Sequence, residues 1–176
     1  MSTTGGASTE AWLRGPVPGI DPWLQPAAHA LIQAGDELAA AADGLSTDAL
    51  WATPGGAASV GYHLRHITGS IDRLLTYARG APLDPRQLQT LAAESRPGTP
   101  PAESAALVSE ARAAIGRALA VLGDTSVATL LEARTVGRKA LPTTVLGLLF
   151  HVGEHTQRHA AQIITTAKVV RAGHRA

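Results

Sequence analysis

The sequence predicts an all-α fold, a four-helix bundle, and three observations support that class. Four long segments carry apolar residues at steps of three and four, the period of a helix with one apolar face. No useful run alternates apolar and polar residues, so no sheet is expected. The 176 residues are 45% hydrophobic and 16% charged, a composition that suits one folded domain. Four amphipathic helices bury their apolar faces by meeting in a shared core.

The first two helices have sequence signals at both ends. One helix is expected over about residues 24–42, because Asp21-Pro22 can open it and Gly44 can stop it. The second is expected over residues 60–78, because Ser59 is a favourable N-cap residue and a glycine and a proline follow the segment. In both segments the apolar residues fall on one side of the expected helix.

The remaining helices are bounded in the same way. Thr99-Pro100 opens the third long helix and Gly123 closes it. The fourth runs from near Thr143 to near Val170. A short helix near residues 86–94 is expected in the connection between the second and third.

Two regions are expected: a flexible arm rich in Gly, Ser and Thr over residues 1–20, and a single bundle domain over residues 21–172. The most apolar run, Leu141–Val152, is interrupted by Pro142 and is far shorter than the roughly 20 residues of a membrane span. The first residues lack the basic and apolar regions of a secretory signal. These features favour a cytoplasmic protein with no membrane partner.

Charge and cysteine content exclude several classes of protein. The 15 Lys and Arg nearly balance the 14 Asp and Glu, so the chain lacks the basic excess of nucleic-acid-binding proteins. Because the chain has no cysteine, disulfides, thiolate metal ligands and a cysteine nucleophile are excluded. The cations of Arg65, Arg73, Arg138 and Lys139 are expected to be solvated surface groups.

The histidines carry the main functional signal. His151, His155 and His159 are spaced four residues apart and therefore share one side of the fourth helix. His155 and His159 fall at the centre of its apolar stripe, so they are expected to point into the bundle. An unpaired buried polar group costs roughly 2–7 kcal/mol, and a metal ion that binds one nitrogen of each ring removes that cost. The alternative is two core histidines that are hydrogen-bonded to the backbone or to a glutamine.

The second helix can supply a third metal ligand, because His63 and His66 both flank its apolar stripe. Three ligands leave an open coordination position, as in catalytic zinc sites. Two other metal patterns fit poorly. The H-x-x-E-H pattern of inverted zincins, His151 to His155, places its Glu off the apolar stripe. The Glu-x-x-His pairs of di-iron bundles are absent.

Two segments carry a family resemblance: SVGYHLRHITGSIDRLLTYARG at 59–80 and LLFHVGEHTQRHAAQI at 148–163. With them the chain resembles the DinB-like superfamily, bacterial four-helix bundles that include metal-dependent hydrolases and thiol-dependent transferases. His66 matches the histidine of the family's second helix, and His155 and His159 match the His-x-x-x-His pair of its last helix. The family often has Arg-Gly after the last histidine, where this chain has Ala160-Ala161.

The resemblance implies a divalent metal, zinc or nickel, held by His66, His155 and His159. It also implies a small-molecule substrate attacked by water or by a thiolate. Any thiol would be a low-molecular-weight cosubstrate, because the chain has no cysteine. His151 is either an accessory catalytic group or a partly exposed histidine at the end of the bundle.

A second functional class remains open, a non-catalytic metal-binding or stress-associated bundle that acts as a homodimer. Small residues at Gly35, Ala39 and Gly116 would permit close packing between two subunits. They would serve equally well inside the core of one bundle.

Overall fold

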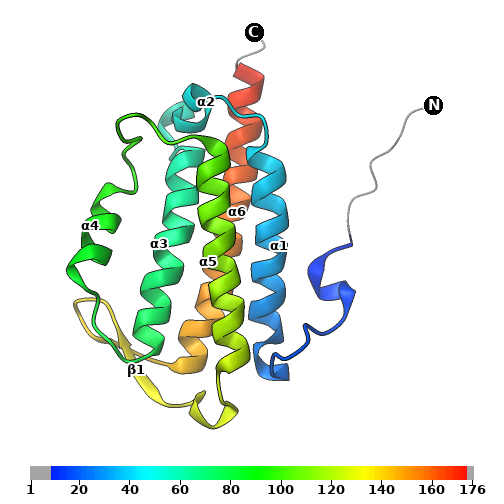
Figure 1. Ribbon diagram of the computed structural model, residues 1–176, viewed down its shortest axis with the longest axis vertical. Helices are drawn as coiled ribbons and strands as arrows, with labels where there is room; N and C mark the ends of the chain where they lie inside the picture. Colours follow the sequence, from blue (N-terminus) through cyan, green and yellow to red (C-terminus); the bar gives the residue numbers. More distant parts are fainter. Residues whose placement is uncertain (1–8, 174–176) are drawn as a thin grey trace.

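The computed structural model describes residues 9–173, and it confirms the all-α fold (Figure 1). Four long helices form the bundle: α1 Gln25–Ala42, α3 Val60–Ala78, α5 Ser104–Asp124 and α6 Val145–Gly173. Two short helices lie in the connections: α2 Thr47–Trp51 and α4 Pro85–Ala93. Single 3-10 turns occur at Ala11–Arg14, Pro22–Leu24, Pro54–Gly56 and Val127–Thr129.

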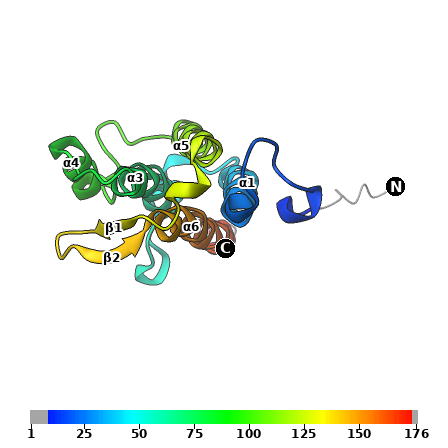
Figure 2. The same cartoon turned by 90° about the horizontal axis from the view of Figure 1, so that it is seen from below.

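The four long helices enclose one aliphatic core. Helices α5 and α6 each pack against both α1 and α3, so α1 and α3 occupy opposite corners of the bundle (Figure 2). Helices α3 and α6 run in opposite directions (Figure 1) and pack against each other. Fully buried side chains come from each long helix, among them Leu31, Leu64, Ile67, Leu122 and Ile163.

Local hydrogen bonds explain where α3 and α4 begin. The Ser59 hydroxyl oxygen accepts from the Tyr62 backbone N–H at 3.1 Å, as expected of an N-cap. At α4, Asp84 accepts from the Gln87 backbone N–H at 2.8 Å, and the Gln87 side chain accepts from the Asp84 N–H at 3.1 Å. This reciprocal capping box satisfies two backbone donors that the helix itself leaves unpaired.

The expectation of no sheet is wrong, because one short hairpin is present. Strand β1 Ala133–Val136 pairs antiparallel with β2 Leu141–Thr144. The turn uses left-handed backbone at Gly137 and Ala140, with φ of 72° and 48°. Four-residue strands offer too few positions for an alternating pattern, and the proline in β2 is atypical of a strand, so the sequence does not reveal the pair.

Part of the expected N-terminal arm is folded. Residues 1–8 lie outside the described residues, but Ala11, Arg14 and Gly15 make polar contacts with α1. The Ala11 backbone N–H donates to Gln33 Oε1 at 2.8 Å, and the Arg14 guanidinium lies 2.9 Å from Asp36 Oδ2. The His29 ring is hydrogen-bonded to the Gly15 carbonyl at 2.9 Å. These polar contacts hold the segment on the outer face of α1.

The small residues on α1 and α5 divide between core and surface. A Cβ on Gly35 would lie 3.6 Å from Ile115 Cδ1, so this glycine serves close packing inside the bundle. Gly116 is exposed and a Cβ there would meet no atom within 4 Å. Within residues 9–173, no helix combines the length and the apolarity that a bilayer crossing requires.

Replacement of Gly153 by alanine is expected to destabilise the chain by about 1–3 kcal/mol. A Cβ at Gly153 would lie 2.8 Å from the Ala27 carbonyl oxygen and 2.9 Å from Ala27 Cα, which are backbone atoms of α1 that cannot turn aside. Urea unfolding measures the change in the free energy of unfolding. Gly116→Ala is the matched control and should stabilise by about 0.5–1 kcal/mol, the usual gain from alanine in a helix. An equal gain from Gly153→Ala would contradict the close α1–α6 packing.

Candidate metal centre

Helices α3 and α6 bring three histidines together. His66, from α3, and His155 and His159, from α6, each offer a ring nitrogen, and these atoms all lie within 4.8 Å of one another. His66 Nε2 lies 3.0 Å from His155 Nε2, and the ring centroids of His66 and His159 are 4.4 Å apart. The cluster thus combines one position of α3 with two successive turns of α6.

The three rings lie along the seam between the two helices rather than in the centre of the core. The expectation that His155 and His159 occupy the middle of the apolar stripe of α6 is wrong. The fully buried residues are the next ones along the chain, Thr156 and Ala160. His155 and His159 are half-buried, and the side chain of His66 is 16% exposed. This placement shields the rings from most of the water and keeps one side of the cluster near the surface.

A buried carboxylate holds the His66 ring. Glu94 follows directly after α4, is 2% exposed, and its Oε2 lies 2.7 Å from His66 Nδ1. Because a carboxylate accepts the hydrogen bond, Nδ1 carries the proton and Nε2 keeps its lone pair for the cluster. Sequence reasoning missed Glu94, since nothing local marks a contact between residues 28 positions apart.

The expectation that Arg73 is a solvated surface group is wrong. Arg73 is 8% exposed, and its Nη1 donates to Glu94 Oε1 at 2.6 Å. A buried carboxylate needs such a partner, because an unpaired buried charge costs several kcal/mol. Arg138 and Lys139 are exposed, as expected.

Gly69 leaves room for this ion pair. A Cβ at Gly69 would collide with Glu94 Oε1 and would lie 2.6 Å from Arg73 Nη1. Arg65, also expected to be solvated, is partly buried and binds the segment after α4 by donating to the Arg96 and Pro97 carbonyls. The glycine and the two arginines therefore let α4 and its following residues reach the histidines.

His63 lies behind His159 and outside the three-histidine cluster. Its Nδ1 is 2.9 Å from His159 Nδ1, so one ring donates to the other across the α3–α6 seam. His63 is 6% exposed. His63 is therefore a hydrogen-bond partner of His159, and Glu94 is a hydrogen-bond partner of His66.

His151 lies at the edge of the cluster. Its ring centroid is 5.1 Å from that of His155, its side chain is 44% exposed, and its Nδ1 lies 3.1 Å from Glu154 Oε2. Glu154 also pairs with Arg158. The carboxylate of the H-x-x-E-H segment thus turns toward His151 and Arg158, and the inverted-zincin pattern finds no support.

Burial lowers the pKa of three of the histidine rings at this seam, those of His63, His155 and His159. Desolvation is the main cause that lowers the pKa of His155 to about 4 and that of His159 to about 3, and the neighbouring His66 adds to both effects. Desolvation, then His66, likewise lowers the pKa of His63 to about 4. Near neutral pH these rings are neutral, which is the form of imidazole that binds a metal.

The donor set fits a divalent ion. Two ring nitrogens bound to one tetrahedral zinc lie about 3.3 Å apart, given zinc–nitrogen bonds of roughly 2.0–2.1 Å. The separation of 3.0 Å between His66 Nε2 and His155 Nε2 is close to that edge. His155 Nδ1 is buried and has no hydrogen-bond partner among the described residues, so this ring is not explained by a saturated hydrogen-bond network.

Comparison with known proteins agrees with this geometry. The sequence model of the DinB superfamily matches residues 30–163, which is more than half of the chain and includes all three histidines. The chain therefore belongs to the DinB superfamily. No curated protein matches the sequence.

The metal-free chain is expected to lose stability as the pH falls below about 6.5, the pKa of an unperturbed histidine. In the folded state the pKa values of His155 and His159 are lowered to about 4 and about 3, so between these values and 6.5 the unfolded chain binds more protons. The free energy of unfolding therefore rises with pH across this window. Urea unfolding in EDTA, near neutral pH and at about pH 5, measures the effect.

His159→Gln should reduce this pH dependence, whereas His29→Gln, at a site outside the cluster, should preserve it. Imidazole proton resonances give an independent readout of the same groups. Resonances of His155 and His159 that titrate with a midpoint near 6.5 in the folded chain would contradict the assignment of neutral buried rings.

Proposed function

We propose that this member of the DinB superfamily is a metal-dependent enzyme in which His66, His155 and His159 hold one divalent ion, zinc or nickel. Its reaction is hydrolysis of a small molecule or transfer of a low-molecular-weight thiol to one. The main support for this proposal is that three ring nitrogens from two helices lie within 4.8 Å of one another. Three neutral ligands leave the ion an open position, which is the feature of catalytic sites.

The surrounding residues prepare the histidines for this role. Glu94 accepts a hydrogen bond from the Nδ1–H of His66 and so leaves Nε2 free to bind the ion. A hydrogen bond between the Nδ1 atoms of His63 and His159 restrains the ring of His159. When bound, the ion supplies Lewis-acid chemistry, polarising a carbonyl or lowering the pKa of a coordinated water or thiol. No carboxylate belongs to the three-residue donor set, so the charge of the ion is not neutralised by its protein ligands.

The thiol of a transfer reaction must come from outside the protein, because the chain contains no cysteine. A cytoplasmic location would supply it, since low-molecular-weight thiols are kept reduced there. His151 is the accessory group of this proposal. Its role would be to hold or release a proton beside an incoming substrate, and the partly exposed ring at the edge of the cluster, paired with Glu154, supports this.

The untagged chain is expected to carry about one zinc or nickel ion per protein molecule, and alanine at His66, His155 or His159 should abolish this binding. Each substitution removes one of only three protein ligands. Metal content after reconstitution near neutral pH is measured by plasma mass spectrometry. His29→Ala is the matched control, because the His29 ring is bound to the Gly15 carbonyl on the outer face of α1.

Full metal content in the three cluster variants would refute the proposed site. Turnover of ester, amide or thiol-plus-electrophile substrates should then appear in the loaded chain and disappear on chelation. Stoichiometric metal without turnover of these substrate classes would favour the second function, a non-catalytic metal-binding bundle, and sedimentation would show whether that bundle is a homodimer.

Glu94→Gln is expected to weaken metal binding by about 10–100-fold, the usual effect of removing an outer partner of a metal-bound histidine. The amide keeps the shape of the side chain but loses the charge that orients His66 and binds Arg73. Competition with a chromogenic chelator gives the dissociation constant. Glu110→Gln, an exposed carboxylate on α5, is the control and should bind metal as the wild type does. Wild-type affinity in Glu94→Gln would show that Glu94 serves only the fold.

A further inference from the structure

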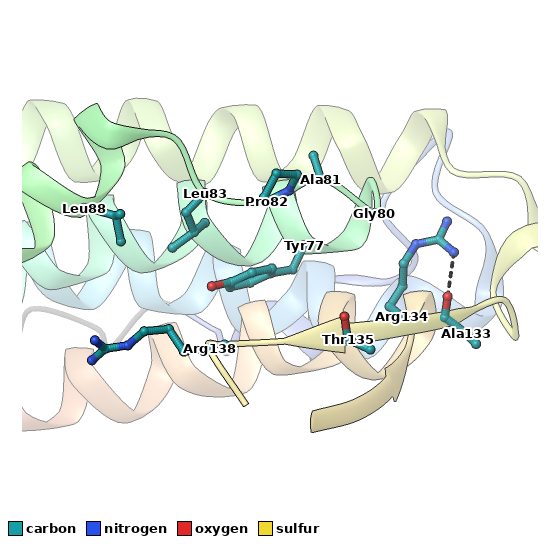
Figure 3. A pocket seen from close by; sticks show the side chains of 11 residues that line it. Tyr77, Gly80, Ala81, Pro82, Leu83, Leu88, Ala133, Arg134, Thr135 and Arg138 are labelled. Atoms are coloured by element: carbon teal, nitrogen blue, oxygen red, sulfur yellow. Dashed lines mark hydrogen bonds between the residues drawn. The ribbon is translucent and has the colours of Figure 1, made fainter. Parts of the chain in front are cut away.

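A cavity of about 620 Å³ opens beneath the β-hairpin, away from the histidines (Figure 3). It is formed by the last turn of α3, the segment leading into α4, and β1. Tyr77 follows His66 by eleven residues on α3, which places the two about 16 Å apart along the helix axis. The cavity is therefore a separate feature, and its volume is within the range of small-molecule sites.

One wall of this cavity is apolar and open to solvent. Tyr77, Pro82, Leu83 and Leu88 line it, and Leu88 is 50% exposed. Figure 3 shows the flat ring of Tyr77 beneath Leu83, with its hydroxyl directed toward the side where Leu88 and Arg138 lie. An aromatic or branched apolar body could cover these side chains and remove them from water.

The charge of the lining has a single sign. Arg134 and Arg138 line the cavity, and no carboxylate from residues 9–173 does. By contrast, the neighbouring hollow between α3 and α4 is lined by Asp72 and Asp84 as well as by arginines. The hairpin cavity consequently favours an anion over a cation.

The two arginines have different roles. The Arg134 guanidinium already has protein partners, because its Nε donates to the Ala78 carbonyl at 2.8 Å and its Nη2 pairs with Glu132 at 2.8 Å. The bond to the Ala78 carbonyl fastens the hairpin to the end of α3. Arg138, on the hairpin turn, has no hydrogen-bond or ion-pair partner among residues 9–173, and neither does the Tyr77 hydroxyl. Two polar groups able to donate hydrogen bonds thus border an apolar wall with no protein acceptor.

We propose that this cavity binds a small organic anion, a carboxylate attached to an aromatic or branched apolar body. The carboxylate accepts hydrogen bonds from the Arg138 guanidinium and the Tyr77 hydroxyl, and the apolar body packs on Tyr77, Leu83 and Leu88. A guanidinium can engage a carboxylate with two parallel hydrogen bonds, which adds geometric selectivity to the charge. This binding is independent of the metal centre.

Phenylacetate is the probe, with phenylacetamide as its uncharged analogue and acetate as the anion without the ring. Phenylacetate should bind, and amide resonances of Gly80 and Gly137 at the cavity should shift on titration. Both analogues should bind several-fold more weakly. Arg138→Gln should weaken phenylacetate binding by about threefold to tenfold, the range expected for loss of a partly exposed charged hydrogen bond. Binding should be the same in metal-loaded and EDTA-treated protein.

Lys139→Gln is the matched control, because Lys139 is the next exposed cation on the turn but does not line the cavity. It should leave phenylacetate binding unchanged. Equal binding of phenylacetamide, equal losses in Arg138→Gln and Lys139→Gln, or shifts confined to residues outside the cavity would each overturn the assignment. Dependence of the binding on metal would also overturn it and would place the ligand at the histidines instead.

Discussion

The buried carboxylate of Glu94 is the constraint on which the arrangement around the histidines depends. A carboxylate that is 2% exposed requires charged or hydrogen-bonding partners, and Arg73 and His66 supply them from α3. Those two contacts hold the end of α4 against the bundle. They also require a residue without a side chain at Gly69, and they fix which nitrogen of His66 faces the cluster.

The same bundle separates two kinds of chemistry along α3. Its first half faces α6 with the imidazoles of His63 and His66, and burial lowers the pKa of His63 to about 4 and that of His159, on α6, to about 3. Its last turn faces a hairpin whose cavity is lined by apolar side chains and arginines. The eleven residues from His66 to Tyr77 along α3 separate the two places by about 16 Å.

Much of the fold follows from local pattern. Apolar residues at steps of three and four predict the long helices, and Ser59 and the short helix before Glu94 occur as expected. The hairpin was missed because its strands are short and one contains a proline. At the site, Glu94 and Arg73 were not predictable, since their roles come from contacts 28 and 21 residues apart in sequence.

By itself, the sequence determined that His155 and His159 share one side of a helix and that the chain offers no thiolate, because helical spacing and composition are local properties. Only the tertiary structure decided that His66 joins the cluster while His63 supports it from behind. That choice depends on the rotation of α3 about its axis against α6. The rotation is set by how the whole apolar face packs and by where Glu94 can reach, which no single segment specifies.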